Sequence, residues 1–248
     1  MDLGLKDKIV FITGASSGIG AYAAQIISAE GSDEVVSLAN NSVGAGQTAA
    51  QVQANGRKAW LCRMDVSDPD DVNLAIHALS PEIRGLDALV LCAGLSLHHA
   101  FAEITPAEWQ RVLAVNLNGA FYVLQACTPL FRDRSSVVLV SSVSAQTGVS
   151  HQAHYAAAKA GLVNLAKSAA RALAPRVRVN CVTPGLTLTP MGLDTIAALN
   201  QDYAKNKMLL QRYATPEEIA QVIVFLASPM NSFMTGATVD VNGGRDLR

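Results

Sequence analysis

Short apolar runs alternate along this chain with longer segments rich in alanine and leucine. The short runs hold many β-branched residues and few polar ones, as in parallel strands that are buried on both faces. They predict strands at residues 8–12, 34–39, 57–63, 86–92, 136–141, 177–182 and 238–241. The longer segments predict helices at residues 19–30, 42–54, 69–80, 106–131, 153–173 and 215–227. This alternation predicts an α/β fold: a doubly wound, seven-stranded, mainly parallel sheet with helices on both faces.

No repeat, low-complexity tract or long linker interrupts this pattern, so residues 1–248 are expected to form a single domain. The longest stretch between core elements covers residues 187–212. In an open α/β sheet the ligand lies beyond the carboxyl ends of the strands. Residues 187–212, Ser142 and Gly94 should therefore meet at that edge.

The composition narrows the range of partners. Half of the 248 residues are hydrophobic, 16% are charged and the net charge is −1. This balance allows a large core and gives no electrostatic reason to expect nucleic acid or an acidic membrane as a partner. Residues 1–8 do not resemble a signal peptide, and no uncharged apolar run approaches the roughly 18 residues of a membrane span. A soluble, cytoplasmic protein without a membrane span is expected.

Neither the cysteines nor the histidines have the spacing of metal ligands, so no metal site is expected. The cysteines are scattered at Cys62, Cys92, Cys127 and Cys181. Those in strand-like runs, Cys62, Cys92 and Cys181, are interpreted as reduced thiols of the core. The histidines near the expected mouth of the site are His98, His99, His151 and His154.

A glycine-rich turn follows the first predicted strand. It reads Thr-Gly-Ala-Ser-Ser-Gly-Ile-Gly over residues 13–20, and a helical pattern comes directly after it. Such a turn lets main-chain N–H groups approach a pyrophosphate at the positive end of a helix. Gly14 would permit the tight turn, Gly18 the close approach and Gly20 the packing of helix on strand. The spacing is not that of the standard dinucleotide fingerprint, and a tight turn without a ligand is the alternative.

Tyr155 and Lys159 form a Tyr-Ala-Ala-Ala-Lys run in a predicted helix, and Ser142 lies thirteen residues upstream at a strand end. Positions four apart share a helix face, so the ammonium can lie near the phenol. A nearby cation favours the phenolate and lowers its pKa, and oxidised nicotinamide would add a second positive charge. A phenol, a cation and a hydroxyl are the groups needed to move a proton on or off a carbinol oxygen. The alternative is a packing tyrosine and a solvated lysine.

Taken together, the motifs resemble the short-chain dehydrogenase/reductase family over essentially the whole chain. The matching residues, in order, are Thr13-Gly14, Gly18-Ile19-Gly20, Asp65-Val66, Cys92-Ala93-Gly94, Asn116, Ser142, Tyr155, Lys159, Pro184-Gly185, Thr235-Gly236 and Asp240 to Gly244. The resemblance implies a Rossmann-type domain that moves a hydride between a nicotinamide cofactor and a secondary alcohol or ketone. It also implies that residues 187–212 form a lid over the substrate.

The resemblance implies a role for each catalytic residue. Tyr155 would be the general acid/base, Lys159 would lower its pKa and hold the nicotinamide ribose, and Ser142 would orient the substrate oxygen. Asn116 would bend its helix locally and anchor a proton-relay water near Lys159. Ser141 competes with Ser142 on sequence alone, and a buried asparagine that satisfies main-chain groups is the alternative for Asn116.

The resemblance also gives expected binding residues. The expected cofactor contacts are Gly14, Ser16, Ser17, Gly18, Ile19, Gly20, Asn40, Asp65, Val66, Cys92, Ala93, Gly94, Tyr155, Lys159, Pro184, Gly185, Thr187 and Thr189. The expected substrate contacts are Ser142, Ser144, Gln146, His151, Tyr155, Leu186 and Met191. For Asp65, a helix-capping role is the alternative. The substrate pocket should be mostly apolar, and no cationic clamp is evident because residues 90–98 and 141–158 lack arginine and lysine.

Two departures from the family pattern affect the interpretation. Cys92 stands where an asparagine is usual, which removes side-chain hydrogen bonds; a structural cost and no reactive thiolate are expected, because no cation flanks it. Asn40 stands about where members that prefer NAD carry aspartate. It can still bind ribose hydroxyls, and no cation is in place for the 2′-phosphate of NADP. NAD(H) is therefore favoured, with NADP(H) as the alternative.

Three functions remain open. The first is an oxidoreductase acting on a secondary alcohol or ketone, and the second is an NADPH-linked 3-oxoacyl reductase. The third, a catalytically silent dinucleotide-binding sensor or scaffold, is disfavoured because the catalytic residues are intact. A homodimer or homotetramer is also expected, since the equivalents of helices 106–131 and 153–173 pack against partner subunits in the family. Inward packing of both helices on their own sheet is the alternative.

Overall fold

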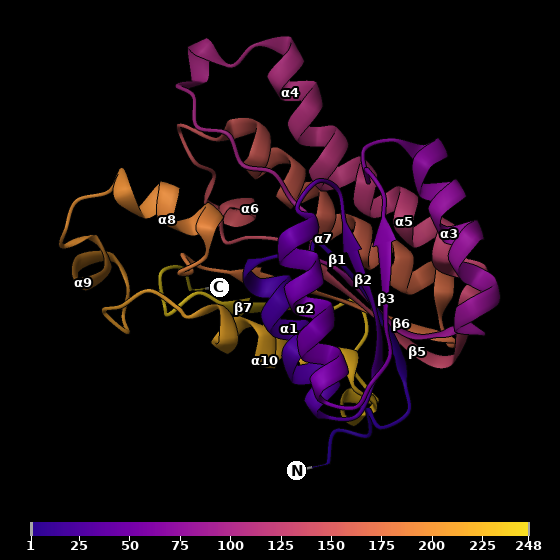
Figure 1. Cartoon of the computed structure of the whole chain (residues 1–248). Coiled ribbons are helices and arrows are strands. Elements are labelled where there is room, and N and C mark those ends of the chain that lie inside the picture. The colour runs from indigo at the N-terminus through magenta and orange to yellow at the C-terminus, as the bar shows by residue number, and fades with distance from the viewer. Residues whose placement is uncertain (1, 248) are drawn as a thin grey trace.

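The computed structural model describes residues 2–247, and a parallel sheet of seven strands runs through the described part (Figure 1). The strands are β1 (Ile9–Thr13), β2 (Asp33–Leu38), β3 (Ala59–Arg63), β4 (Leu86–Leu91), β5 (Phe131–Val140), β6 (Val177–Pro184) and β7 (Thr238–Val241). They lie in the order β3-β2-β1-β4-β5-β6-β7, and every neighbouring pair is parallel. The chain winds outwards from β1 in one direction and from β4 in the other, which leaves a crevice between their carboxyl ends. The predicted fold class is confirmed.

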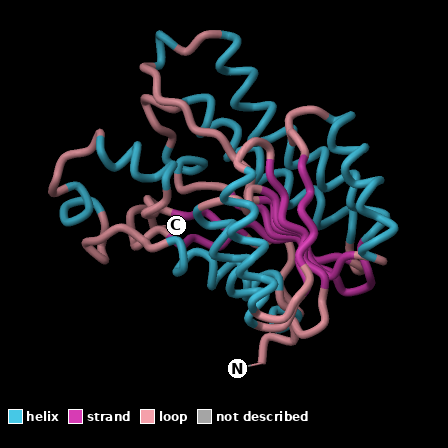
Figure 2. Tube along the Cα trace, viewed as in Figure 1, coloured by secondary structure: helices cyan, strands magenta, loops and turns pink. Residues whose placement is uncertain are grey.

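Helices cover both faces of this sheet, and Figure 2 shows the strands as the central layer between them. The long helices are α1 (Gly18–Ala29), α2 (Ser42–Ala54), α3 (Pro69–Ile83), α4 (Pro106–Leu113), α5 (Gly119–Cys127), α7 (Ala153–Leu173) and α10 (Pro216–Ala227). The shorter ones are α6 (Ser144–Thr147), α8 (Pro190–Ala197) and α9 (Tyr203–Lys207), with 3₁₀ turns at Phe101–Glu103, Thr128–Leu130 and Pro229–Asn231. Helices α1, α2 and α10 pack on one face, and α3, α5 and α7 on the other.

Two hydrophobic clusters, one on each face, hold the layers together. Successive side chains of a strand point to opposite faces. On β1, Phe11 therefore joins the cluster under α3, α5 and α7, while Val10 and Ile12 join the cluster under α1 and α10. All three side chains are fully buried. Burial on both faces explains why these strands appear in the sequence as continuous apolar runs rather than alternating ones.

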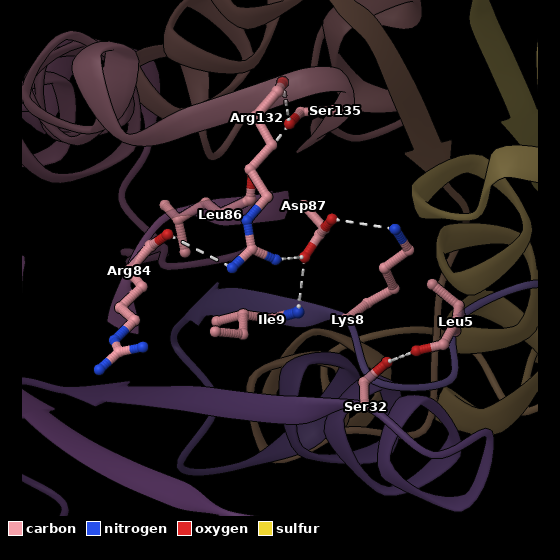
Figure 3. A network of polar contacts seen from close by, with 9 residues as sticks. All are labelled: Leu5, Lys8, Ile9, Ser32, Arg84, Leu86, Asp87, Arg132 and Ser135. Carbon is pink, nitrogen blue, oxygen red and sulfur yellow. Dashed lines mark hydrogen bonds and ion pairs between the residues drawn. The ribbon is translucent and has the colours of Figure 1, made fainter. Parts of the chain in front are cut away.

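A polar network closes the amino-terminal edge of the sheet (Figure 3). The Asp87 carboxylate, at the start of β4, accepts from the main-chain N–H of Ile9 at 3.0 Å and from Lys8 Nζ at 3.2 Å. It also pairs with Arg132 at 2.5 Å, while Arg132 donates to the main-chain oxygen of Arg84. One carboxylate thus joins the starts of β1, β4 and β5. These charged groups stabilise the amino-terminal edge of the sheet, opposite to the edge at which the strands end.

The helix predicted over residues 106–131 is wrong in its continuity and at its end. A π-helical turn, Ala114–Asn118, separates α4 from α5, and α5 ends at Cys127. Pro129 lies in the following 3₁₀ turn, where it offers no N–H to extend the helix. Phe131 already pairs with Leu86 as the first residue of β5. Within residues 2–247, no helix is both long enough and apolar enough to cross a membrane.

Candidate active site

A cleft of about 560 Å³ opens at the carboxyl ends of the strands. Its walls come from the β1–α1 turn, the loop after β4 and the segments that follow β5 and β6. Helix α8 contributes Met191, Gly192 and Thr195 to the outer wall. Figure 1 shows α8 and α9 standing clear of the sheet on the side where α6 lies. This is the edge at which the sequence predicts ligand binding.

The three groups of the proposed catalytic set meet in this cleft. Tyr155 and Lys159 lie one turn apart on α7, and Lys159 Nζ is 5.5 Å from the centroid of the Tyr155 ring. The Lys159 ammonium donates to the main-chain oxygen of Val140 at 2.9 Å, which fixes it at the end of β5. Ser142 follows the same strand, and its hydroxyl is near enough to the Tyr155 phenol to act on the pKa of that group. A substrate oxygen in the cleft can therefore reach both hydroxyls.

Burial controls the protonation states of Tyr155 and Lys159. It raises the pKa of Tyr155 to about 12, although the Ser142 hydroxyl acts in the opposite direction. It lowers the pKa of Lys159 to about 8. At neutral pH the first is therefore a phenol and the second mainly an ammonium. In the protein alone the pKa of Tyr155 is thus raised overall, because desolvation of the phenolate is the largest effect on it.

Ser141 and Ser142 have different environments. The Ser141 hydroxyl is buried and donates to the main-chain oxygen of Lys159 at 2.6 Å, so it ties β5 to α7. The Ser142 hydroxyl accepts from the main-chain N–H of Ser144 at 3.1 Å and faces Tyr155. This arrangement favours Ser142 as the residue that contacts substrate. Ser141 holds the helix that carries Tyr155 and Lys159.

Asn116 is fully buried in the π-helical turn and anchors the loop after β4. Its amide nitrogen donates to the main-chain oxygens of Leu95 at 2.7 Å and Val112 at 2.9 Å, and its oxygen accepts from the Leu95 N–H at 3.2 Å. These bonds match the structural alternative for Asn116. A Cβ atom added to Gly94 would lie 2.9 Å from Asn116 Oδ1 and 3.5 Å from Lys159 Nζ. Asn116 is thus also close to Lys159, as a relay would require.

The glycine-rich turn has the shape of a dinucleotide cradle. Gly14 has φ +67°, and a Cβ atom there would lie 2.8 Å from the Ala93 Cα. On Gly20, a Cβ atom would lie 2.5 Å from the main-chain oxygen of Gly14, so only glycine lets α1 start so close to β1. Gly18 has φ +54° and faces Thr189. The main-chain N–H groups at the start of α1 remain open to the cleft, so the residues fit a bound pyrophosphate.

Comparison with known proteins finds relatives over nearly the whole chain. A family model described as "Enoyl-(Acyl carrier protein) reductase" matches residues 14–246. An L-rhamnose 1-dehydrogenase (NAD(P)(+)) from Sphingomonas sp. is 35% identical over 97% of this chain and 96% of its own. A 3-oxoacyl-[acyl-carrier-protein] reductase FabG from Aquifex aeolicus is 34% identical, with 98% and 99% covered. The chain belongs to the short-chain dehydrogenase/reductase family.

Solved structures extend the likeness to the whole fold. A short-chain dehydrogenase/reductase from Brucella melitensis, described as a glucose/ribitol dehydrogenase, superimposes with a TM-score of 0.93 at 34% identity and covers 100% of both chains. A blue fluorescent protein from a metagenomic library, solved in complex with NADPH, gives a TM-score of 0.91 at 28% identity and covers 98% of this chain and 100% of its own. This chain is accordingly an NAD(P)-dependent oxidoreductase of the family, with a substrate still to be assigned.

The loop that departs from the family pattern at Cys92 is held by Thr13 instead. The Thr13 hydroxyl accepts from the main-chain N–H groups of Cys92 at 3.0 Å and Ala93 at 3.1 Å. Burial raises the pKa of the Cys92 thiol to about 11, although the nearby Lys159 charge lowers it. Cys92 is therefore a thiol at neutral pH, as expected. Sequence reasoning placed Thr13 in the matching glycine-rich turn but missed its role as an acceptor for the loop after β4.

The far end of the cleft has no arginine or lysine among the described residues that line it. Asn40, Asn41, Ser16, Ser17 and Ser67 line it together with Asp65 and Val66. Asn41 caps α2 by accepting from the Gly44 N–H at 3.0 Å, and it also donates to the main-chain oxygen of Ser16. Asp65 accepts from the N–H and hydroxyl of Ser67, whereas Asp68 caps α3. The Asn40 main-chain oxygen accepts from the Ser42 N–H, but its side chain has no hydrogen-bond partner within residues 2–247 and is left to meet a ligand.

The expected substrate residues divide into two groups. Ser144, Leu186 and Met191 line the cleft, but Gln146 and His151 do not. The Gln146 amide instead donates to Asp240 at 2.8 Å, and the exposed His151 offers its main-chain oxygen to His99. Because residues 144–147 form the helix α6, Ser144 and Gln146 point in different directions. The sequence predicted only the end of a strand before them and not this helix.

Polar and cationic residues that were not expected also reach the cleft. Ser96 and Gln152 hydrogen-bond each other at 2.6 Å, and His98 bridges Gln152 to Thr195 of α8. Two arginines, Arg111 and Arg245, line the cleft as well. Arg245 directly follows the matching run that ends at Gly244, and Arg111 precedes Asn116 by five residues, but no local pattern predicts that either side chain reaches the cleft. No cationic clamp was evident from residues 90–98 and 141–158, and both arginines come from outside those ranges.

Proposed function

We propose that this protein transfers a hydride between a nicotinamide cofactor and a secondary alcohol or ketone, with Tyr155 as the general acid/base. The shared location of the Ser142 hydroxyl, the Tyr155 phenol and the Lys159 ammonium in one cleft supports this proposal. The nicotinamide ring, when bound, accepts or supplies the hydride. The side chains of the cleft handle the proton and orient the substrate oxygen.

Each group has a defined task in the proposed mechanism. Ser142 donates to the substrate oxygen and orients it. In reduction, Tyr155 gives its proton to that oxygen; in oxidation, the phenolate takes the proton from the carbinol. The Lys159 charge lies 5.5 Å from the ring and stabilises the phenolate that reduction leaves behind. Asn116 would hold a water next to Lys159 through which solvent restores the proton.

Replacement of Tyr155 by phenylalanine tests the mechanism. Tyr155→Phe should keep the ring in place and lower turnover by at least about 100-fold, which is the scale of general acid/base catalysis. Fluorescence titration with NADH is the control, because cofactor binding should survive. Unchanged turnover would exclude Tyr155 as the acid/base. A protein that binds NADH and turns over no alcohol or ketone would instead fit the silent sensor or scaffold.

NAD(H) is proposed as the preferred cofactor, with NADP(H) as the alternative. Asn40, Asn41, Ser16 and Ser17 supply hydrogen bonds but no charge at the adenosine end of the cleft. A 2′-phosphate normally gains a charge-assisted partner, which this end does not offer. Paired titrations with NADH and NADPH, in one buffer at fixed salt, should show tighter NADH binding. Tighter NADPH binding would contradict the assignment.

A 3-oxoacyl reductase is the second candidate function, supported by the 34% identity to FabG from Aquifex aeolicus. That activity would require turnover of a 3-oxoacyl thioester, with NADPH as the reductant. A comparison of thioester reduction with oxidation of simple secondary alcohols separates the two candidates. Preference for both NADPH and the thioester would favour the reductase.

We also propose that residues 187–212 act as a lid and that the protein forms a homodimer or homotetramer. Thr189 starts α8 beside Gly18, while Arg212 binds Glu218 of α10 through two hydrogen bonds of 2.8 and 2.6 Å. Both ends of the segment are thus held against the body of the protein.

The proposed homodimer or homotetramer would use the face of α5. Phe121 on this helix is 43% exposed and is available to a partner subunit. A monomeric mass by light scattering would contradict the assembly.

A further inference from the structure

The segment after β7 carries an arginine into the cleft. Asn242 packs against the turn after β6, where a Cβ atom on Gly185 would lie 2.8 Å from the Asn242 Cα. Gly243 and Gly244 then turn the chain with φ +64° and +75°. The main-chain oxygen of Gly243 accepts from the Leu210 N–H at 3.0 Å, which ties this turn to the lid. These contacts set the place of Arg245, which lines the cleft.

The Arg245 guanidinium is oriented but not neutralised. Its Nε donates to the Tyr203 hydroxyl of α9 at 3.0 Å, and its terminal nitrogens donate to no atom of residues 2–247. The ion pairs of the same residues do not include Arg245. A guanidinium held by Nε presents a planar pair of N–H donors that matches a carboxylate.

The strand order separates Arg245 from the dinucleotide cradle. The glycine-rich turn follows β1, Ser142 follows β5 and Pro184-Gly185 follows β6, whereas Arg245 follows β7 at the edge of the sheet. The dinucleotide cradle and Arg245 therefore lie on opposite sides of Ser142. Neighbouring strands are about 4.8 Å apart, so β7 stands roughly 10 Å from β5. A short molecule with its carbinol at Ser142 and Tyr155 can span that gap once the arginine side chain reaches inwards.

We propose that Arg245 binds a carboxylate of the substrate and that the protein acts on a short-chain hydroxy acid or oxo acid. This rests on the proposed oxidoreductase function and names its substrate class. One cation at this end of the cleft matches one negative charge. The other arginine of the cleft, Arg111, comes from α4 and not from the lid or the β7 turn.

Kinetics on a matched set of alcohols test the substrate class. The compounds are 3-hydroxybutanoate, its methyl ester and butane-1,3-diol, with NAD. The unmodified protein should prefer the acid at least about tenfold in kcat/KM, and Arg245→Leu should lower kcat/KM for the acid by roughly 10- to 100-fold while the ester stays within about twofold. Arg245→Lys should keep part of the preference. Lys58→Leu removes the same charge from an exposed position before β3, outside the cleft and the lid, and should change nothing.

The outcomes separate this inference from the proposed function. Equal use of acid and neutral alcohols, or a preference for the acid that survives Arg245→Leu, would overturn the carboxylate site and leave the oxidoreductase function standing. Preference for a phosphate monoester such as glycerol 3-phosphate would also overturn it. If no compound is turned over, calorimetry of butanoate and butanamide with the NADH complex decides. Butanoate binding that disappears in Arg245→Leu supports the site, and equal binding of the amide or no butanoate binding overturns it.

Discussion

The Lys159 ammonium donates a 2.9 Å hydrogen bond to the main-chain oxygen of Val140, the last residue of β5. This bond holds the end of the long Lys159 side chain, which carries the only charge of the catalytic set, against the sheet. The Ser141 hydroxyl makes a reciprocal contact from the sheet to the main chain of Lys159. Helix α7 and strand β5 therefore hold Ser142, Tyr155 and Lys159 as one unit.

The protonation of Lys159 should govern ketone reduction as the pH rises. Reduction needs Tyr155 as a phenol and Lys159 as an ammonium, and their pKa values are about 12 and about 8. Both are mainly protonated at about pH 7 and below, so kcat/KM should be level there and should fall as Lys159 loses its proton around pH 8. The measurement is kcat/KM for reduction from about pH 6 to about pH 10, in buffers of constant ionic strength. A level profile beyond about pH 9 would contradict the lowered pKa of Lys159.

Thr13 should be needed for the loop that approaches the cofactor. Thr13→Val keeps the shape but leaves the N–H groups of Cys92 and Ala93 without their acceptor, and each buried unpaired group costs about 1–3 kcal/mol. The free energy of unfolding should fall by about 2 kcal/mol or more, and NADH should bind more weakly. Thr13→Ser keeps the hydroxyl and is the matched control. Equal stability of the valine and serine variants would show that the hydroxyl is not needed.

Glu34 should make the protein less stable as the pH rises. Its side chain is fully buried on β2, and burial raises its pKa well above the usual value, with a smaller contribution from Asp33. Neither carboxyl oxygen has a well-formed hydrogen bond in residues 2–247, although the Ser28 main chain is near enough to lower the pKa slightly. The folded protein therefore keeps a proton that the unfolded chain releases near pH ~4.3.

The difference between the pKa of Glu34 in the folded and unfolded protein predicts how the free energy of unfolding changes with pH. Between the unfolded pKa and the raised folded pKa, the free energy of unfolding should drop by up to about 1.4 kcal/mol per pH unit. Glu34→Gln removes the titration and should gain stability over the original protein from about pH 5 to about pH 8. Urea unfolding at the two pH values provides the measurement. An advantage of Glu34→Gln that is the same at both would show that Glu34 does not titrate in this range.

Asn116 should contribute to both stability and turnover. Asn116→Ala leaves the Leu95 N–H and two main-chain oxygens without their partner, so the free energy of unfolding should fall by about 2–4 kcal/mol. The exposed neighbour Asn118 provides the control, and Asn118→Ala should change stability by less than about 0.5 kcal/mol. If Asn116 also holds a relay water, kcat will fall more than NADH binding does. A loss of stability with kcat intact would restrict Asn116 to its structural contacts.

The sequence predicts the frame of this site better than its lining. Continuous apolar runs mark strands such as β1 because both faces are buried, and Gly14 marks a turn that only a positive φ allows. The role of Thr13 depends on a loop nearly eighty residues away, as the separation of 79 to Cys92 shows. Arg245 reaches the cleft because β7 is the sheet edge beside β6, and Gln146 leaves it because α6 is helical. Such placements depend on tertiary contacts that no local pattern contains.

The π-helical turn at Ala114–Asn118 makes the length of this helical run critical. A π turn holds about one residue more than an α turn, so everything beyond it is rotated by roughly 100° from its place in a regular helix. Helix α4 can thereby face α7 while α5 faces α3. Deletion of a single residue from this turn would restore a smooth helix but swing α5 off its neighbour and Asn116 off Leu95. A substitution in this turn removes the contacts of one side chain, whereas a change in the number of residues displaces the whole of α5.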